Sequence, residues 1–297
     1  MKKYVFTARD ETKLVCSLWD DVKRPVGVVQ IIHGMDEHVL RYDRFAKFLN
    51  RHGYIVFGDD HRAHGRTAGT PDEIGVAHPG QDLFAETVDD ELEIIGYLKN
   101  KYALPLFLFG HSYGSFITQA LMEKTDLAAA GVCLSGSARY PRGMAAIGAL
   151  LAWIGVKTHG AAAPARLIEF FSPIRGSVDG GSPLSRDADQ VRQHEADPMR
   201  VKYFSYGFYL SLFRNLMRLH GDGNPEVPLL IISGGRDIVS RNSRLSMALY
   251  REYQAHNFQN LTLIIYPDAR HELLMELNYQ QVQQDILDFF NSITKKL

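Results

Sequence analysis

Ser112 stands between two glycines at the end of an apolar run, in the segment L-P-L-F-L-F-G-H-S-Y-G of residues 104–114. This pattern is typical of a nucleophile elbow, in which a buried strand turns sharply into a helix and presents one hydroxyl. Gly110 and Gly114 suit such a turn because side chains there would crowd the approach of strand and helix. The pattern alone is weak, but its place before a helical stretch at 115–124 predicts Ser112 as a nucleophile.

A serine hydroxyl needs a neighbouring base, and in this architecture the partners follow the serine in the order acid, then histidine. His271 lies in P-D-A-R-H-E directly after the last apolar run, where a sheet can present a base at its active edge. His256 instead closes an amphipathic stretch and is interpreted as a polar helix end. We therefore expect His271 to be the base.

The base needs a carboxylate to orient it. Asp237, in I-S-G-G-R-D-I-V, follows the apolar run at 229–232 and is the expected acid. Asp268 follows the next run and is the alternative, although its position three residues before His271 disfavours a facing geometry.

The tetrahedral intermediate of acyl transfer carries an oxyanion, which backbone N–H groups must meet. One donor in this architecture is the residue after the nucleophile, here Tyr113. The other comes from the loop after the third strand, H-G-M-D-E-H at 33–38, where Met35 is the expected donor.

The surrounding pattern alternates short apolar runs with amphipathic stretches, which predicts an α/β fold with a mostly parallel sheet covered by helices. A hairpin of two short strands is expected first. The expected later strands are Val26–Ile32, Tyr54–Phe57, Leu106–Phe109, Gly131–Leu134, Leu229–Ile232 and Leu261–Tyr266. The expected helices are Arg41–Arg51, Leu83–Lys101, Ser115–Lys124, Ser243–Tyr253 and Gln280–Ile293.

One connection breaks this alternation. No strand candidate appears between residues 137 and 227, where the pattern indicates several helices with Pro and Gly breaks. An insertion of this length at the edge where strands end predicts a lid. We therefore expect a hydrolase core from residues 1–136 and 228–297 and a helical cap from 137–227.

Composition narrows the class of protein. With 297 residues, 45% hydrophobic and 23% charged, the chain is typical of a globular protein, and its net charge of −1 argues against nucleic-acid binding. Cys16 and Cys133 are expected to be buried free thiols, which favours a reducing compartment. The first residues contain no apolar run typical of a secretory signal, so a cytoplasmic location is expected.

With these pieces in place, the chain resembles the α/β-hydrolase superfamily, and within it the monoacylglycerol lipase and lysophospholipase group of proline-iminopeptidase-like serine hydrolases. The resemblance covers nearly the whole sequence. It implies a triad of Ser112, Asp237 and His271, an oxyanion hole from Met35 and Tyr113, and a helical cap. The matching segments are H-G-M-D-E-H (33–38), D-H-R-A-H-G-R-T (60–67), G-H-S-Y-G-S (110–115), L-S-R-D (184–187), A-D-P (196–198), G-G-R-D-I-V (234–239) and R-H-E-L-L-M-E (270–276).

Three positions depart from the family pattern: Ala63 and Ser115 where glycine is usual, and Thr67 where serine is usual. None removes a catalytic atom, so they leave the triad intact and affect only the expected substrate details.

Other polar residues near these motifs have structural interpretations. The set Asp59, Asp60, His61 and His64 offers metal-ligand types, but its order differs from His-first dinuclear clusters and the family uses this loop to brace the site, so no metal is expected. His33 and His111 are expected to make structural hydrogen bonds. Glu37 and His38 are expected to fix the oxyanion loop.

The stretch Met144–Val156 lacks charged residues and is bordered by Arg139, Arg142 and Lys157. It is too short to cross a bilayer. Three interpretations stay open: a buried cap helix, a wall of an acyl-chain tunnel, and a surface that docks transiently on lipid. The aromatic stretch Tyr203–Met217 is expected to be mainly core, with one or two rings facing the pocket.

The expected activity is hydrolysis of a small hydrophobic carboxylic ester through an acyl-enzyme at Ser112, without a metal or organic cofactor. Monoacylglycerol or lysophospholipid comes first by family resemblance. One alternative is a small-peptide aminopeptidase or amidase, for which Glu169, Glu195 or Asp197 would have to supply an anionic pocket. The other is a hydrolase-fold ligand-binding protein without turnover.

Overall fold

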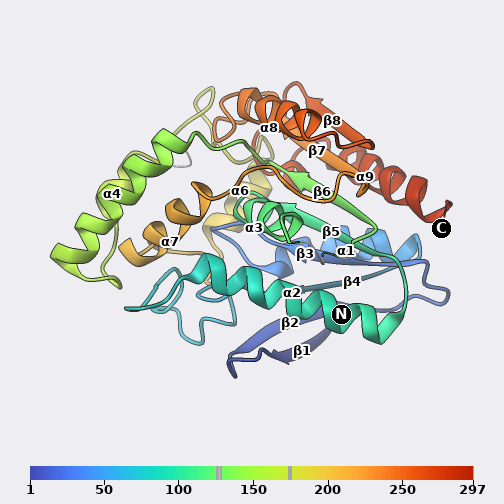
Figure 1. Ribbon diagram of the computed structural model, residues 1–297, viewed down its shortest axis with the longest axis horizontal. Helices are drawn as coiled ribbons and strands as arrows, with labels where there is room; N and C mark the ends of the chain where they lie inside the picture. Colours follow the sequence, from blue (N-terminus) through green and yellow to red (C-terminus); the bar gives the residue numbers. More distant parts are fainter. Residues whose placement is uncertain (125–126, 128, 173–175, 297) are drawn as a thin grey trace.

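The computed structural model describes residues 1–124, 127, 129–172 and 176–296. Within these residues one sheet of eight strands has the order β1-β2-β4-β3-β5-β6-β7-β8 (Figure 1). The pairs β1–β2 and β2–β4 are antiparallel, and every other neighbouring pair is parallel. The predicted mostly parallel α/β-hydrolase sheet is confirmed. The strands are β1 Lys2–Thr7, β2 Lys13–Trp19, β3 Gly27–Ile32, β4 Tyr54–Asp59, β5 Leu106–His111, β6 Gly131–Ser135, β7 Leu229–Gly234 and β8 Leu261–Tyr266.

The central strands are buried along their whole length. Every residue of β3, β4, β5, β6 and β7 is buried, because helices cover both faces of the sheet. The edge strand β1 instead alternates exposed and partly buried residues. Cys16 on β2 and Cys133 on β6 are buried free thiols, as expected.

Two helical layers enclose the sheet. Phe45 of α1 and Phe290 of α9 belong to one core cluster with Phe109 of β5. Ile117 of α3 and Tyr253 of α8 belong to the cluster on the other face, where α2 also packs. The five predicted helices agree with these to within two residues at each end. The layer helices are α1 Asp43–Arg51, α2 Leu83–Tyr102, α3 Tyr113–Met122, α8 Arg244–Ala255 and α9 Tyr279–Thr294.

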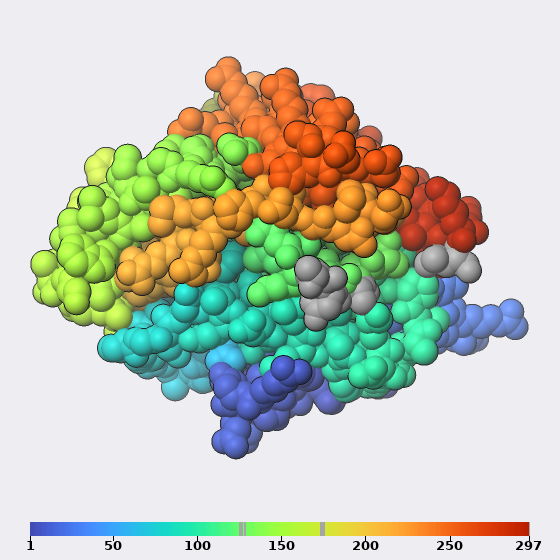
Figure 2. All heavy atoms as spheres, in the orientation of Figure 1, coloured from blue at the N-terminus to red at the C-terminus, as the bar shows by residue number. Residues whose placement is uncertain are grey.

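Between β6 and β7 the described residues form four helices: α4 Arg142–His159, α5 Arg166–Phe170, α6 Ala188–Glu195 and α7 Tyr206–Leu216. Figures 1 and 2 show α4 and α7 side by side at one end of the molecule. Gly148 and Gly155 of α4 lie directly against the rings of Phe213 and Tyr206, so the two helices approach closely where α4 lacks side chains. Among the helices that the structure describes, none has the length and apolar character needed to cross a bilayer.

Candidate active site

Ser112 occupies the sharp turn between β5 and α3. Its backbone angles, φ +50° and ψ −115°, are strained for a residue with a side chain. A β-carbon at Gly110 would overlap Oγ1 of Thr118, and one at Gly114 would overlap the carbonyl oxygen of Ile32. The two glycines are therefore needed for the close approach of strand, helix and loop that holds this turn.

The loop after β8 brings His271 to Ser112. Nε2 of His271 lies 2.8 Å from Oγ of Ser112, and Nδ1 of the same ring lies 3.1 Å from Oδ2 of Asp237, which follows β7. The backbone N–H of Val239 donates to the other carboxylate oxygen of Asp237 at 2.8 Å. The three residues predicted from the sequence therefore lie in line at the carboxyl edge of the sheet.

The surroundings shift the pKa values of His271 and Asp237 in opposite directions. Burial acts to lower the pKa of His271, but the facing Asp237 carboxylate outweighs burial, and the net pKa is raised. Burial acts to raise the pKa of Asp237, but the charge and hydrogen bond of His271 outweigh it, and the net pKa is lowered. The pair is therefore arranged to stabilise an imidazolium beside a carboxylate.

The alternatives for base and acid lie elsewhere. Asp268 is exposed, and the structure brings Asp237 rather than Asp268 to His271. His256 pairs with Asp222 at the end of α8, 3.0 Å apart on the surface.

Met35 and Tyr113 both border the same cavity as Ser112. Among the described residues, neither backbone N–H has a hydrogen-bond acceptor, so both donors are available. Gly34 packs against Ser112, since a β-carbon added to Gly34 would lie 3.4 Å from Cβ of Ser112. Oε1 of Glu37 accepts the N–H of Gly34 at 2.6 Å, so Glu37 holds this loop from inside.

Arg41 joins the loop at residues 33–38 to the loop that carries His271. Its guanidinium donates two 2.8 Å hydrogen bonds to Glu272, and a third at 3.1 Å to Oε2 of Glu37. Arg41 keeps the pKa of Glu272 well below its usual range although burial acts to raise it. The sequence analysis missed Arg41 and the role of Glu272; their signals were an arginine four residues after Glu37 and a carboxylate directly after His271.

The segment after α6 is tied to the same loop. Asp36 accepts hydrogen bonds from the N–H of Val201 at 2.8 Å and from Nε of Arg200 at 3.0 Å. Nε2 of His38 lies 2.8 Å from Oδ2 of Asp197. His38 thus contacts the insertion, whereas Glu37 contacts the oxyanion loop itself.

A cavity of about 440 Å³ opens at Ser112, within the size range of small-molecule sites. Its walls are largely apolar, and among the described residues that line it none is acidic and the charged one is Arg241. Four side chains of α7, from the stretch expected to be mainly core, contribute to the walls, as do residues of α4. The main lining residues besides Met35, Ser112 and Tyr113 are Phe116, Tyr140, Met144, Ile147, Leu151, Ile168, Phe171, Tyr209, Leu212, Phe213, Leu216, Ile238 and Leu245.

The acidic residues considered for an amine pocket lie outside this cavity. Glu169 accepts the N–H of Phe204 at 2.7 Å, Asp197 pairs with His38, and Glu195 is exposed at the end of α6. None of these three residues lines the cavity at Ser112.

The outer face of α4 is apolar and exposed. Ile147, Leu150 and Trp153 have 63%, 56% and 44% of their surface accessible, and Ile154 is similarly exposed. Small residues face α7 instead, so α4 is not the fully buried helix that one interpretation of its sequence offered. Ile147 also lines the cavity, which makes this helix part of its wall.

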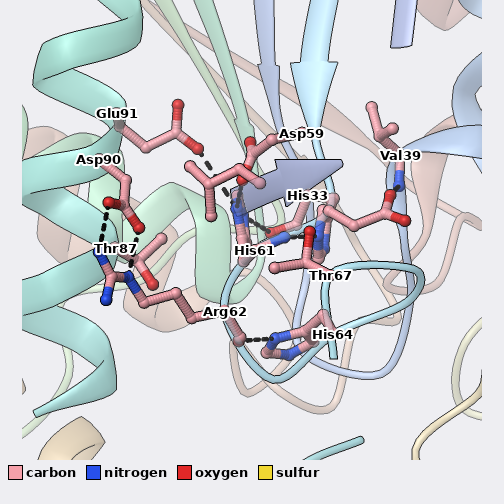
Figure 3. Close-up of polar contacts among 12 residues, drawn as sticks. His33, Val39, Asp59, His61, Arg62, His64, Thr67, Thr87, Asp90 and Glu91 are labelled. Carbon is pink, nitrogen blue, oxygen red and sulfur yellow. Dashed lines mark hydrogen bonds and ion pairs between the residues drawn. The ribbon is translucent and has the colours of Figure 1, made fainter. Parts of the chain in front are cut away.

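The four metal-ligand candidates separate in the structure. Asp60 pairs with Arg66 at 2.7 Å, whereas Asp59 and His61 meet Glu91 of α2 in a buried cluster (Figure 3). His64 turns away, with Nδ1 2.8 Å from the carbonyl oxygen of Arg62. Asp59, His61 and Glu91 are the residue types that could hold a metal ion, and the sequence analysis had not included Glu91.

Similarity to known proteins extends over nearly the whole chain. The family model described as serine aminopeptidase, S33, matches residues 23–278. A monoacylglycerol lipase of Mycolicibacterium smegmatis is 27% identical over 98% of this chain and 97% of its own. A solved structure of a lipase in an open form has 26% identity and a TM-score of 0.84, covering 99% of both chains. A carboxyl esterase of Bacillus coagulans has the same fold, with a TM-score of 0.85, 23% identity, and coverage of 99% of this chain and 98% of its own.

Proposed function

The chain belongs to the serine aminopeptidase S33 family of hydrolases, and from this premise we propose that it cleaves carboxylic esters of hydrophobic acyl groups with a Ser112–His271–Asp237 triad. The observation that carries the proposal is the 2.8 Å contact between Nε2 of His271 and Oγ of Ser112, continued by Asp237 at 3.1 Å. These distances suit direct proton transfer from the hydroxyl to the ring.

The proposed reaction has two halves. Oγ of Ser112 attacks the ester carbonyl carbon while His271 takes the hydroxyl proton, and the N–H groups of Met35 and Tyr113 meet the oxyanion. His271 then gives that proton to the leaving alcohol as the C–O bond breaks. Water repeats the attack on the acyl-enzyme with His271 again as base, which releases the carboxylic acid and restores Ser112. Asp237 stabilises the imidazolium in both halves.

The cavity supports a hydrophobic acyl group. Its apolar walls match a fatty chain, and about 440 Å³ is room for one chain rather than several. The similarity to a monoacylglycerol lipase over nearly the full length of both chains makes monoacylglycerols the first substrates to test. An aminopeptidase would need a negative group for the substrate amine, and the described lining of this cavity contains none.

The two parts of the chain have different roles in this proposal. Residues 1–136 and 228–297 form the catalytic core, and residues 137–227 act as a cap that supplies most of the acyl wall. The exposed apolar face of α4, bordered by Arg142 and Lys157, supports transient contact of this cap with lipid surfaces.

The experiment is an ester panel that varies acyl length and alcohol, run on wild type and Ser112→Ala, with aminoacyl-naphthylamides as amide substrates. Hydrolysis of long-chain esters by wild type alone, with fluorophosphonate labelling lost in Ser112→Ala, is the expected result. Preference for aminoacyl amides would favour the peptidase, and absence of both turnover and labelling in wild type would favour a binding protein.

A further inference from the structure

A buried polar cluster contacts the loop at residues 33–38, and its residues do not line the substrate cavity. It contains Asp59 at the end of β4, His61 on the following loop and Glu91 of α2, all with almost no accessible surface (Figure 3). Nδ1 of His61 is 3.1 Å from Oδ2 of Asp59 and 3.3 Å from Oε1 of Glu91. The proposed reaction uses none of these groups directly.

Both ring nitrogens of His61 face oxygen atoms. Nδ1 faces the two carboxyl groups, and Nε2 lies 3.2 Å from the carbonyl oxygen of His33, which is an acceptor only. A ring with acceptors at both nitrogens is best satisfied when both carry protons. Both ring nitrogens of His61 are therefore placed to donate.

The two carboxyl groups lie too close for both to be ionised in a dry site. Oδ2 of Asp59 and Oε1 of Glu91 both face Nδ1 of His61, and burial followed by the charge of Asp59 raises the pKa of Glu91 well above its usual value. Burial also acts to raise the pKa of Asp59, but His61 outweighs it and the net pKa is lowered. One proton on this pair of carboxyl groups leaves a single negative charge beside the ring of His61.

His61 holds His33 by three contacts. The backbone N–H of His61 donates to Nε2 of His33 at 3.0 Å, Nε2 of His61 reaches the carbonyl oxygen of His33, and the two rings stack 3.8 Å apart. Because Nε2 of His33 is an acceptor, its proton sits on Nδ1, which donates to the carbonyl oxygen of Gly34 at 2.7 Å. Burial, followed by the nearby His61 and His64, keeps the pKa of His33 well below its usual value, consistent with this neutral form.

The Gly34 carbonyl belongs to the same peptide group as the N–H of Met35. In a trans peptide the C=O and N–H point in opposite directions, so fixing one fixes the other. The hydrogen bond from His33 therefore sets where the N–H of Met35 points, and this is one of the two free donors at Ser112.

We propose that Asp59 and Glu91 share one proton and hold His61 as a cation, and that His61 acts through His33 to aim the N–H of Met35 at the oxyanion. This inference rests on the proposed ester hydrolysis at Ser112. Asp59, Glu91, His61 and His33 are then positioning residues, since they touch the loop and not the substrate.

The shared charge predicts a distinctive mutant pattern. In Glu91→Gln or Asp59→Asn one carboxyl group remains to carry the negative charge, so each single variant should keep kcat within about threefold of wild type. The double variant Asp59→Asn/Glu91→Gln removes that charge, and its kcat should fall about 10- to 100-fold. This loss is smaller than that caused by deleting an oxyanion-hole donor outright, because the N–H of Met35 is misplaced and not removed. KM for a short soluble ester should change less than kcat, because the misplaced donor acts mainly in the transition state.

A neighbouring carboxylate provides the control. Asp90 lies beside Glu91 on α2 but points to Arg62, with two hydrogen bonds of 2.6 and 2.7 Å (Figure 3). Asp90→Asn should lower the melting temperature through the lost ion pair and leave kcat unchanged. Melting temperatures of all variants separate loss of folding from loss of positioning.

Three results would overturn the inference. The first is a loss of kcat in folded Glu91→Gln as large as that in the double variant, and the second is a wild-type kcat in the folded double variant. The third is a stoichiometric amount of a divalent metal in the purified protein. If the double variant does not fold, infrared difference spectra of wild type and Glu91→Gln test the inference instead. Wild type should show a protonated-carboxyl band that Glu91→Gln lacks, and absence of this band from wild type would overturn the inference. Turnover by wild type and its loss in Ser112→Ala test the proposed function separately, whatever the cluster variants do.

Discussion

The guanidinium of Arg41 donates two 2.8 Å hydrogen bonds to Glu272, the residue that follows His271 in the chain. The same guanidinium contacts Glu37, which accepts the N–H of Gly34 within the loop at residues 33–38. The side chain of Arg41, 9% exposed, therefore connects the loop of His271 to the loop at residues 33–38. Removing it would leave two buried carboxylates without their shared cation.

Arg41→Met should therefore destabilise the protein by about 3–5 kcal/mol, because breaking a buried ion pair leaves uncompensated charge. Arg41→Lys should recover part of this loss but not all, since an ammonium cannot make the paired hydrogen bonds to Glu272. Urea unfolding of both variants measures the difference. An unchanged unfolding midpoint in Arg41→Met would mean that the cluster contributes little to stability.

The pH dependence should follow His271, which must be neutral to take the proton of Ser112. Its pKa is raised above the usual value of about 6.5 by the Asp237 carboxylate, against the effect of burial. kcat/KM should therefore rise with pH through an apparent pKa above that value and fall on the acid side as His271 becomes charged. Glu272 adds to the raised pKa, so Glu272→Gln should move the acid limb to lower pH. A shift to higher pH would contradict this assignment.

The two candidate acids give opposite expectations. Asp237→Asn should reduce kcat by about 10⁴-fold, because the amide can no longer stabilise the imidazolium or the correct tautomer. Asp268→Asn is the matched control, since Asp268 is exposed. Steady-state assays with one ester decide between them, and a larger loss in Asp268→Asn would reverse the assignment.

Much of this site could be predicted because its parts follow strand ends. Ser112 directly follows β5, Asp237 and His271 lie on the loops after β7 and β8, and parallel strands bring their carboxyl ends to one edge. The elbow glycines add a local signal, because only a residue without a side chain fits against Thr118 or Ile32. Local pattern and sheet topology agree at these positions.

The rest depends on contacts that no local pattern encodes. Arg41 and Glu272 are 231 positions apart, and Glu91 meets His61 across a helix–sheet interface. The uncharged run at 144–156 identified a helix but not its orientation, which is decided by the packing of Gly148 and Gly155 against rings of α7. Long-range pairing and helix rotation are properties of the packed structure.

Leu212 of α7 lines the cavity and offers a way to shorten it. Leu212→Trp should fill part of the acyl space, so kcat/KM for a dodecanoyl ester should fall about tenfold while that for an acetyl ester stays within about twofold. Leu212→Ala is the converse variant and should not discriminate against the longer chain. Equal losses for both esters in Leu212→Trp would indicate that the acyl chain lies elsewhere.

Leu150, Trp153 and Ile154 of α4 are exposed and lie outside the cavity lining, so they separate lipid contact from catalysis. Replacing all three with serine should weaken binding to anionic vesicles about tenfold or more, because each buried apolar group contributes to insertion at the interface. Hydrolysis of a soluble acetyl ester should stay within about twofold. The matched control replaces Val5 and Val26, which are exposed but lie outside residues 137–227, with serine. This variant should leave vesicle binding unchanged. Vesicle co-sedimentation measures both, and equal binding by the α4 variant and wild type would remove α4 as a lipid contact.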